Sequence, residues 1–76
     1  MKHILFGVEA VNTLIQGEGI DELVHSVDEG DFTLEVIEVD NCDLEAKMDK
    51  AVFWESWTFI TKEHFELLKP FSKVGV

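Results

Sequence analysis

Apolar residues at helical spacing open the chain and predict a first helix that ends at Gly17. Residues 4–8 fit this spacing, but they also form a short apolar run of the kind found in strands. Gly7 is a weak helix former, so a strand remains the alternative for this stretch. We expect the helix. The residues of its apolar face are Ile4, Val8, Val11 and Ile15.

Residues 20–28 show a clearer amphipathic pattern and predict a second helix. Its acidic first turn suits the positive end of the helix dipole, whereas Asp28 and Glu29 lie near the unfavourable negative end. No lysine or arginine lies close enough in sequence to compensate these two carboxylates. The apolar face consists of Ile20, Leu23, Val24 and Val27.

Alternating apolar and polar residues predict a strand over residues 32–39. The alternation shifts by one position at Val36 and Ile37, and either a β-bulge or a strongly twisted strand would accommodate that shift. The polar residues 40–50 that follow predict a loop with one helical turn.

The β-branched and aromatic residues at 51–61 predict a second strand, antiparallel to the first. Both of its faces are apolar, so each needs cover from helices or from a second subunit. Thr61 and Pro70 are expected to begin and end a short helix over residues 62–69. One face of the strand carries Val52, Trp54 and Ile60, and the other carries Phe53, Trp57 and Phe59.

Together these elements predict an α+β fold in a small single domain, residues 1–76. The expected order is α-α-β-β-α, with a two-stranded antiparallel sheet packed by the helices. A chain of 76 residues buries only about 60% of its unfolded surface, and small domains often add disulfides, a metal or a second subunit. The single cysteine, Cys42, cannot form an internal disulfide and indicates a reducing, cytoplasmic location. A homodimer could therefore complete the sheet.

The charge balance narrows the choice of partner. Sixteen acidic residues face six lysines and no arginine, so the formal net charge is −10. Twelve of the carboxylates lie between residues 3 and 46, where there is neither lysine nor arginine. This charge repels nucleic acid and anionic membranes and attracts cationic surfaces. We expect a basic protein surface as the partner, such as that of a nucleic-acid-binding protein, and no direct binding to nucleic acid or membrane.

The acidic tract predicts a non-catalytic protein that binds this basic surface and inhibits or modulates its target. In size and charge the chain resembles small acidic phage or mobile-element proteins that inhibit host enzymes of nucleic-acid handling or defence, some of them by mimicking DNA. The resemblance implies an anti-defence inhibitor. The predicted partner-binding residues are Glu18, Asp21, Glu22, Asp28, Glu29, Asp31, Glu35, Glu38, Asp40, Asp43 and Glu45.

The alternative is a structural or assembly subunit that oligomerises through its aromatic strand, with the charge serving only solubility. Trp54 and Trp57 are three residues apart, so in a strand they project to opposite faces. The helix over residues 62–69 could cover the face of Trp57 through Phe65 and Leu68; otherwise that face is a protein interface. The predicted aromatic interface consists of Phe53, Trp57 and Phe59.

Catalysis, a cofactor and a metal are not expected. Neither Cys42 nor any histidine lies in the local signature of a nucleophile–base pair, and the histidines lack the spacing of a zinc site. Residues 40–45 resemble a calcium loop, but its third position is Cys42 and its sixth is not glycine. Surface or boundary positions are expected for His3, His25 and His64.

Overall fold

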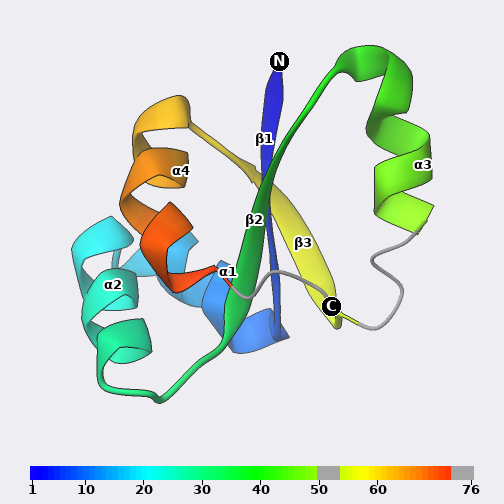
Figure 1. The fold of residues 1–76 in the computed structure, drawn as a ribbon. Helices are drawn as coiled ribbons and strands as arrows, with labels where there is room; N and C mark the ends of the chain where they lie inside the picture. Colours follow the sequence, from blue (N-terminus) through cyan, green and yellow to red (C-terminus); the bar gives the residue numbers. More distant parts are fainter. Residues whose placement is uncertain (50–53, 73–76) are drawn as a thin grey trace.

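A computed structural model describes residues 1–49 and 54–72. Within these ranges three strands and four α-helices form a small α+β domain, which confirms the predicted fold class (Figure 1). The order of elements differs from the prediction, because the chain begins with a strand and a further helix separates the two later strands. The elements are β1 (Lys2–Gly7), α1 (Glu9–Gly17), α2 (Ile20–Asp28), β2 (Leu34–Val39), the 3-10 turn η1 (Asn41–Asp43), α3 (Leu44–Asp49), β3 (Ser56–Ile60), α4 (Lys62–Leu68) and the 3-10 turn η2 (Lys69–Phe71).

β1 lies at the centre of the sheet and pairs antiparallel with both β2 and β3. The predicted two-stranded sheet, in which the two later strands pair with each other, is therefore wrong. Figure 1 shows α1, α2 and α4 on one side of the sheet and α3 on the other. Both faces of the central strand are thus covered.

The predicted first helix is wrong for residues 4–7, which form most of β1. Ile4, Leu5 and Phe6 are all buried, with at most 2% of any of them exposed. A strand covered on both faces buries consecutive residues, and a continuous apolar run results. The helical pattern holds only from α1 onward, where Val11 is fully buried. For the stretch before α1, the strand alternative is confirmed.

Two apolar clusters hold the sheet, one on each face. The main core joins the sheet to α1, α2 and α4, and the small core lies between the sheet, α3 and Trp54. The buried residues of the main core are Leu5, Val11, Leu23, Leu34, Val36, Phe65 and Leu68; those of the small core are Ile4, Phe6 and Val39.

β2 contributes side chains to both cores, which explains its shifted alternation. Leu34 and Val36 belong to the main core, whereas Val39 belongs to the small core on the opposite face. The pairing runs without interruption from Lys2 opposite Val39 to Gly7 opposite Leu34. No residue of β2 is left over, so this ladder contains no β-bulge, and the first of the two alternatives is excluded.

α2 and α4 follow their local sequence signals closely. α2 has the predicted bounds. α4 begins after Thr61, whose hydroxyl accepts a hydrogen bond from the backbone N–H of His64 at 3.1 Å. Pro70 lies in η2, directly after α4. The predicted loop over residues 40–50 is more helical than expected, because η1 and α3 occupy residues 41–49.

The described helices are short, and the longest, α1 and α2, have nine residues each. None of the helices in the described ranges combines the length and the hydropathy needed to span a bilayer.

Candidate functional site

Most of the predicted partner-binding carboxylates are exposed. The exception is Glu35 in β2, which is half-buried and accepts a hydrogen bond from the indole Nε1–H of Trp54 at 3.1 Å. This contact holds Trp54 over the small core. Glu35 therefore has a structural role that its sequence position did not suggest. The exposed members are Glu18, Asp21, Glu22, Asp28, Glu29, Asp31, Glu38, Asp40, Asp43 and Glu45.

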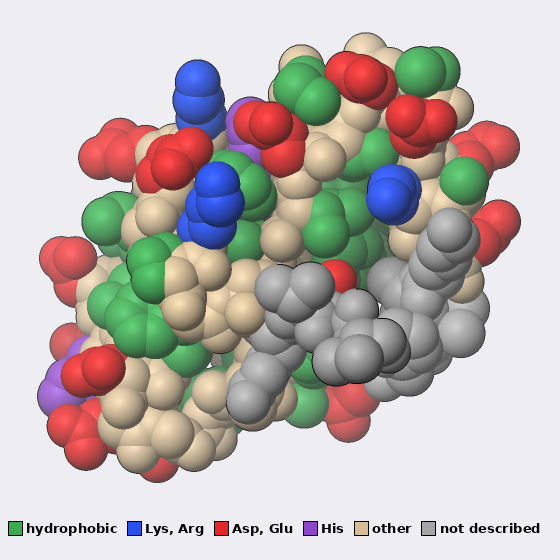
Figure 2. All heavy atoms as spheres, viewed as in Figure 1, with side chains coloured by type: hydrophobic (Ala, Val, Ile, Leu, Met, Phe, Trp, Pro, Cys, Tyr) green, Lys and Arg blue, Asp and Glu red, His purple; other side chains and the backbone are tan. Residues whose placement is uncertain are grey.

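The structure divides these carboxylates between the two sides of the sheet. One group belongs to α2 and the turn after it, and the other to the end of β2, η1 and α3; Figure 1 shows α2 and α3 on opposite sides of the sheet. Figure 2 shows acidic side chains mainly along the margins of the visible face, with lysines and hydrophobic side chains between them. On this face the carboxylates do not form one continuous array.

Few of the acidic groups are neutralised from within. Among residues 1–49 and 54–72 the one contact of salt-bridge length between a carboxylate and a basic side chain joins His3 Nε2 to Glu38 Oε2 at 2.8 Å. The His3 ring also lies 4.9 Å from the ring of Phe65, centroid to centroid. His3 is thus a boundary residue, as predicted, but it has specific contacts. Most carboxylates of the described chain remain available to external cations.

The structure brings Glu18 and Asp31 together along one side of α1. They line an open groove of about 810 Å³, which we call the α1 groove. Glu9, which the sequence analysis did not assign to the site, adds a third carboxylate, and Leu14 and Phe32 are among the apolar residues of its lining. The whole lining is Glu9, Ala10, Thr13, Leu14, Gly17, Glu18, Ser26, Asp31 and Phe32.

Asp40, Cys42 and Asp43 form a second acidic cluster at η1. One ligand atom from each lies within 4.8 Å of the others, and all three side chains are exposed. Exposed carboxylates often gather in this way without a bound ion, and no further observation points to a metal here. The cluster adds negative charge to the α3 side of the molecule.

The aromatic residues of β3 form an exposed pair. Trp57 is 44% exposed and Phe59 is 49% exposed, and their rings meet edge to face with centroids 5.1 Å apart. The ammonium of Lys2 lies 5.7 Å from the centre of the Phe59 ring, within the range of a cation–π contact. Phe53, the third residue of the predicted aromatic interface, lies outside the described residues.

One expectation about these aromatic residues is wrong, and one of the two alternatives for the Trp57 face is excluded. Trp54 precedes β3 and packs on the small core. Trp57 pairs with Phe6, which belongs to the small core, and paired residues project to the same face of a sheet. The two indoles therefore share a face. Phe65 and Leu68 of α4 belong to the main core on the opposite face, so α4 does not cover the aromatic pair.

Within residues 1–49 and 54–72, the outer edge of β3 carries backbone groups that pair with no neighbouring strand. Val36 N–H in β2 points away from β1, because it donates to the Ser72 hydroxyl at 2.9 Å. Val36 pairs with Leu5 of β1. In an antiparallel pair whose residues do not bond each other, both residues turn their N–H and C=O groups away from the partner strand. The backbone groups of Leu5 therefore point toward β3. Leu5 pairs there with Thr58, so the N–H and C=O groups of Trp57 and Phe59 point outward.

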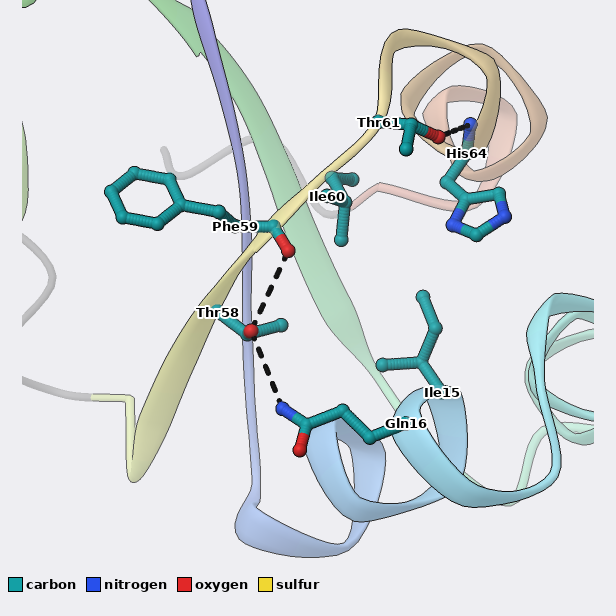
Figure 3. Close-up of a pocket in the computed structure, with 7 residues that line it drawn as sticks. All are labelled: Ile15, Gln16, Thr58, Phe59, Ile60, Thr61 and His64. Carbon is teal, nitrogen blue, oxygen red and sulfur yellow. Dashed lines mark hydrogen bonds between the residues drawn. The ribbon is translucent and has the colours of Figure 1, made fainter.

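Within the described residues, no acceptor outside the sheet receives a hydrogen bond from the backbone N–H of Trp57 or Phe59. The carbonyl of Phe59 accepts only a long one, 3.5 Å, from the Thr58 hydroxyl (Figure 3). Beside β3, on the side of the main core, α1 and α4 leave a hollow of about 380 Å³. Figure 3 shows Ile15 and His64 around this hollow and the Phe59 ring on the other side of the strand. Helices therefore leave this strand edge open.

Polar contacts between α1 and β3 fix the position of this edge. The Asn12 amide donates to the Ser56 hydroxyl, and the Gln16 amide donates to the Thr58 hydroxyl at 3.4 Å. The backbone N–H of Glu9 donates to a carboxylate of Glu55 at 2.9 Å. The partners are more than 40 residues apart, and no local sequence pattern could have revealed them.

A search for related proteins found no family model, curated protein or solved structure that matches the chain.

Proposed function

We propose that the chain binds a basic segment of another protein in the α1 groove, without catalysing a reaction on it, and so inhibits or modulates that protein. The observation that carries this proposal is the lining of the groove. Glu9, Glu18 and Asp31 supply carboxylates, and Leu14 and Phe32 supply apolar surface, in one hollow of about 810 Å³.

The lining of the groove suits lysine and arginine side chains. Both carry a long apolar stem and a cationic head group. Binding is favourable when the stem covers apolar surface while the head group stays in a polar environment. In the α1 groove the stem would lie on Leu14 and Phe32, and the head would face Glu9, Glu18 or Asp31. Charge-assisted hydrogen bonds to carboxylates are about twice as strong as neutral ones.

The remaining carboxylates would act at longer range. A net charge of −10 accelerates the encounter with a cationic partner and disfavours anionic competitors. This contribution depends on the summed field, so it does not require the two acidic groups to touch the same partner surface.

The most concrete form of this proposal is an inhibitor of a nucleic-acid-handling or defence enzyme, since such enzymes expose basic segments to bind phosphate. DNA mimicry would require one target groove to contact carboxylates along a continuous array. The α2 and α3 groups lie on opposite sides of the sheet (Figure 1). We therefore favour capture of one basic segment in the α1 groove over replacement of a DNA duplex.

The test compares two charge reversals of equal size. In the groove variant, Glu18→Lys is combined with Asp31→Lys; in the control, Asp43→Lys is combined with Glu45→Lys on the α3 side. A basic protein retained by the chain from a cell lysate at about 50 mM salt is purified, and its affinity for each variant is measured. We expect the groove variant to lose at least about tenfold in affinity and the control to lose less than about threefold.

Equal losses in the two variants would show that only net charge matters, and the α1 groove would not be the site. Retention of no basic protein at low salt would end the proposal. Circular dichroism of both variants establishes that the reversals leave the fold intact.

A further inference from the structure

The two edges of the sheet differ in how they are protected. Natural sheets guard exposed edges with charged residues or with a covering segment. β2 has both, because it carries Glu35 and Glu38, and Ser72 binds its outward N–H at Val36. β3 has the sequence SWTFI, without a charged residue, in a chain with a net charge of −10.

The unprotected edge coincides with the exposed aromatic pair. Trp57 and Phe59 present their side chains on one face and direct their backbone N–H and C=O groups outward. An edge of this kind can add a further strand, with backbone hydrogen bonds supplying affinity and alternate side chains supplying selectivity.

We propose that β3 pairs antiparallel with β3 of a second copy of this chain, about a two-fold axis at Thr58. In this register Trp57 faces the partner's Phe59, and Phe59 faces the partner's Trp57. Each such pair exchanges two backbone hydrogen bonds, because these residues are the ones that point outward. The four aromatic rings then lie together on one face of a six-stranded sheet, and cross-strand aromatic pairs stabilise sheets.

The ends of β3 fit the same register. Glu55 precedes the strand and Lys62 begins the helix that follows it. Pairing centred on Thr58 places Glu55 opposite the partner's Thr61, next to the partner's Lys62. The charges that flank the paired strands are therefore of opposite sign. A self-complementary contact of this kind is what a closed two-fold dimer requires.

The helix beside the edge fits a two-fold axis as well. α1 contacts both β1 and β3. If α1 lies over the line midway between these strands, it is one strand spacing away from the proposed two-fold axis. The two copies of α1 are then two strand spacings, or about 10 Å, apart. This distance falls in the usual range for packed helices. The hollow of about 380 Å³ beside Thr58 leaves room on that face.

A second copy is favoured over a basic segment as the occupant of this edge. β3 itself carries no carboxylate that could pair with lysine or arginine, and the ammonium of Lys2 already lies 5.7 Å from the centre of the Phe59 ring. In the register centred on Thr58, the edge of β3 is complementary to the same edge of a second copy. The proposed dimer is independent of the α1 groove, and either proposal can fail without the other.

The first test is the dimerisation constant from sedimentation equilibrium for the full chain and two variants. Phe59→Lys places a charge on the open edge and reduces the net charge to about −9, so weaker dimerisation cannot come from greater overall repulsion. Leu67→Lys is the matched control, because Leu67 is 47% exposed on α4 and the charge change is the same. We expect Phe59→Lys to weaken the dimer at least about tenfold and Leu67→Lys to change it less than about threefold.

The second test fixes the register by disulfide formation in a Cys42→Ser background. Thr58 would face the partner's Thr58 in a non-hydrogen-bonded pair with Cα atoms about 4.5 Å apart, so Thr58→Cys should give a covalent dimer on oxidation. The matched variant Ser56→Cys should not, because the two Ser56 positions would be about 13 Å apart, beyond the reach of a disulfide.

A monomer at all concentrations and salt levels overturns the proposal. Equal effects of Phe59→Lys and Leu67→Lys, or faster cross-linking through Ser56→Cys than through Thr58→Cys, overturn it as well. A monomeric chain whose binding to a basic protein is lost in Phe59→Lys would assign the edge to that partner instead of a second copy.

Discussion

Replacing Gly7 with alanine should destabilise this fold, whereas the same change inside a helix would stabilise it. Gly7 ends β1, and a Cβ atom at this position would lie 3.2 Å from both Cβ and Cγ1 of Val11. Val11 is fully buried, and as a β-branched residue in a helix it has one strongly preferred χ1 rotamer. The neighbour cannot move away easily, so the new methyl group overpacks the contact between β1 and α1.

The expected magnitude follows from two opposing effects. Overpacking of a buried contact costs about 1–3 kcal/mol. Alanine also restricts the unfolded chain, which stabilises the protein by about 0.4–1 kcal/mol. The free energy of unfolding should therefore fall by up to about 2.6 kcal/mol, with a central value of about 1.3 kcal/mol. In a helix interior the same substitution would raise it by about 0.8–1.0 kcal/mol, so the sign distinguishes a strand from a helix here.

Urea unfolding followed by circular dichroism measures this change, and a double-mutant cycle with Val11→Ala tests its cause. Val11→Ala alone should cost about 2–3 kcal/mol, because it removes two buried methyl groups. In the double variant the missing methyl groups leave space for the new one at position 7, so the combined cost should be about 1 kcal/mol below the sum of the two single costs. A stabilised Gly7→Ala variant, or costs that add within about 0.3 kcal/mol, would refute the proposed packing of β1 against α1.

Three further substitutions test other parts of the fold. Thr61→Ala should lower the stability by about 1 kcal/mol in urea unfolding, because α4 loses its cap, whereas Thr61→Ser should retain most of it; equal losses would exclude the capping role. Ser72→Ala should cost about 0.5–1.5 kcal/mol and accelerate hydrogen exchange of the Val36 amide, and unchanged exchange would contradict the contact. Leu5→Ala should cost about 2–5 kcal/mol out of roughly 4–11 kcal/mol for a chain of this size, and a loss below about 1 kcal/mol would contradict the central position of β1.

Local signals in the sequence were enough for the helices that follow simple rules. α2 shows one apolar face and an acidic first turn, and its bounds match the prediction. Thr61 and Pro70 mark the limits of α4, because a side-chain cap and a residue without an N–H act within one turn.

The position of β1 could not be read from local pattern alone. Ile4, Val8 and Val11 have helical spacing by coincidence, since Ile4 faces the small core from a strand and Val11 faces the main core from a helix. Only the cover on both faces of the sheet, which comes from α3 and from the helices of the main core, makes a strand the better solution. The same two-sided cover explains the shifted alternation in β2 without a bulge.

The candidate site was predictable only in part. Glu18 and Asp31 were expected to bind a partner because they are acidic, but their shared groove depends on how α1 packs beside the turn after α2. Glu9 was missed for the same reason. Trp57 and Phe59 were expected at an interface, whereas the open backbone edge beside them follows from a strand order that the sequence did not reveal.

The most direct test of the proposed function is the salt dependence of binding between the chain and a captured basic protein. Affinity should fall steeply as salt rises from about 50 to 200 mM, and the fall should be shallower for the variant that combines Glu18→Lys with Asp31→Lys. Affinity that is constant or rises with salt, or an identical dependence in the variant, would contradict binding of a cationic segment by the carboxylates of the α1 groove.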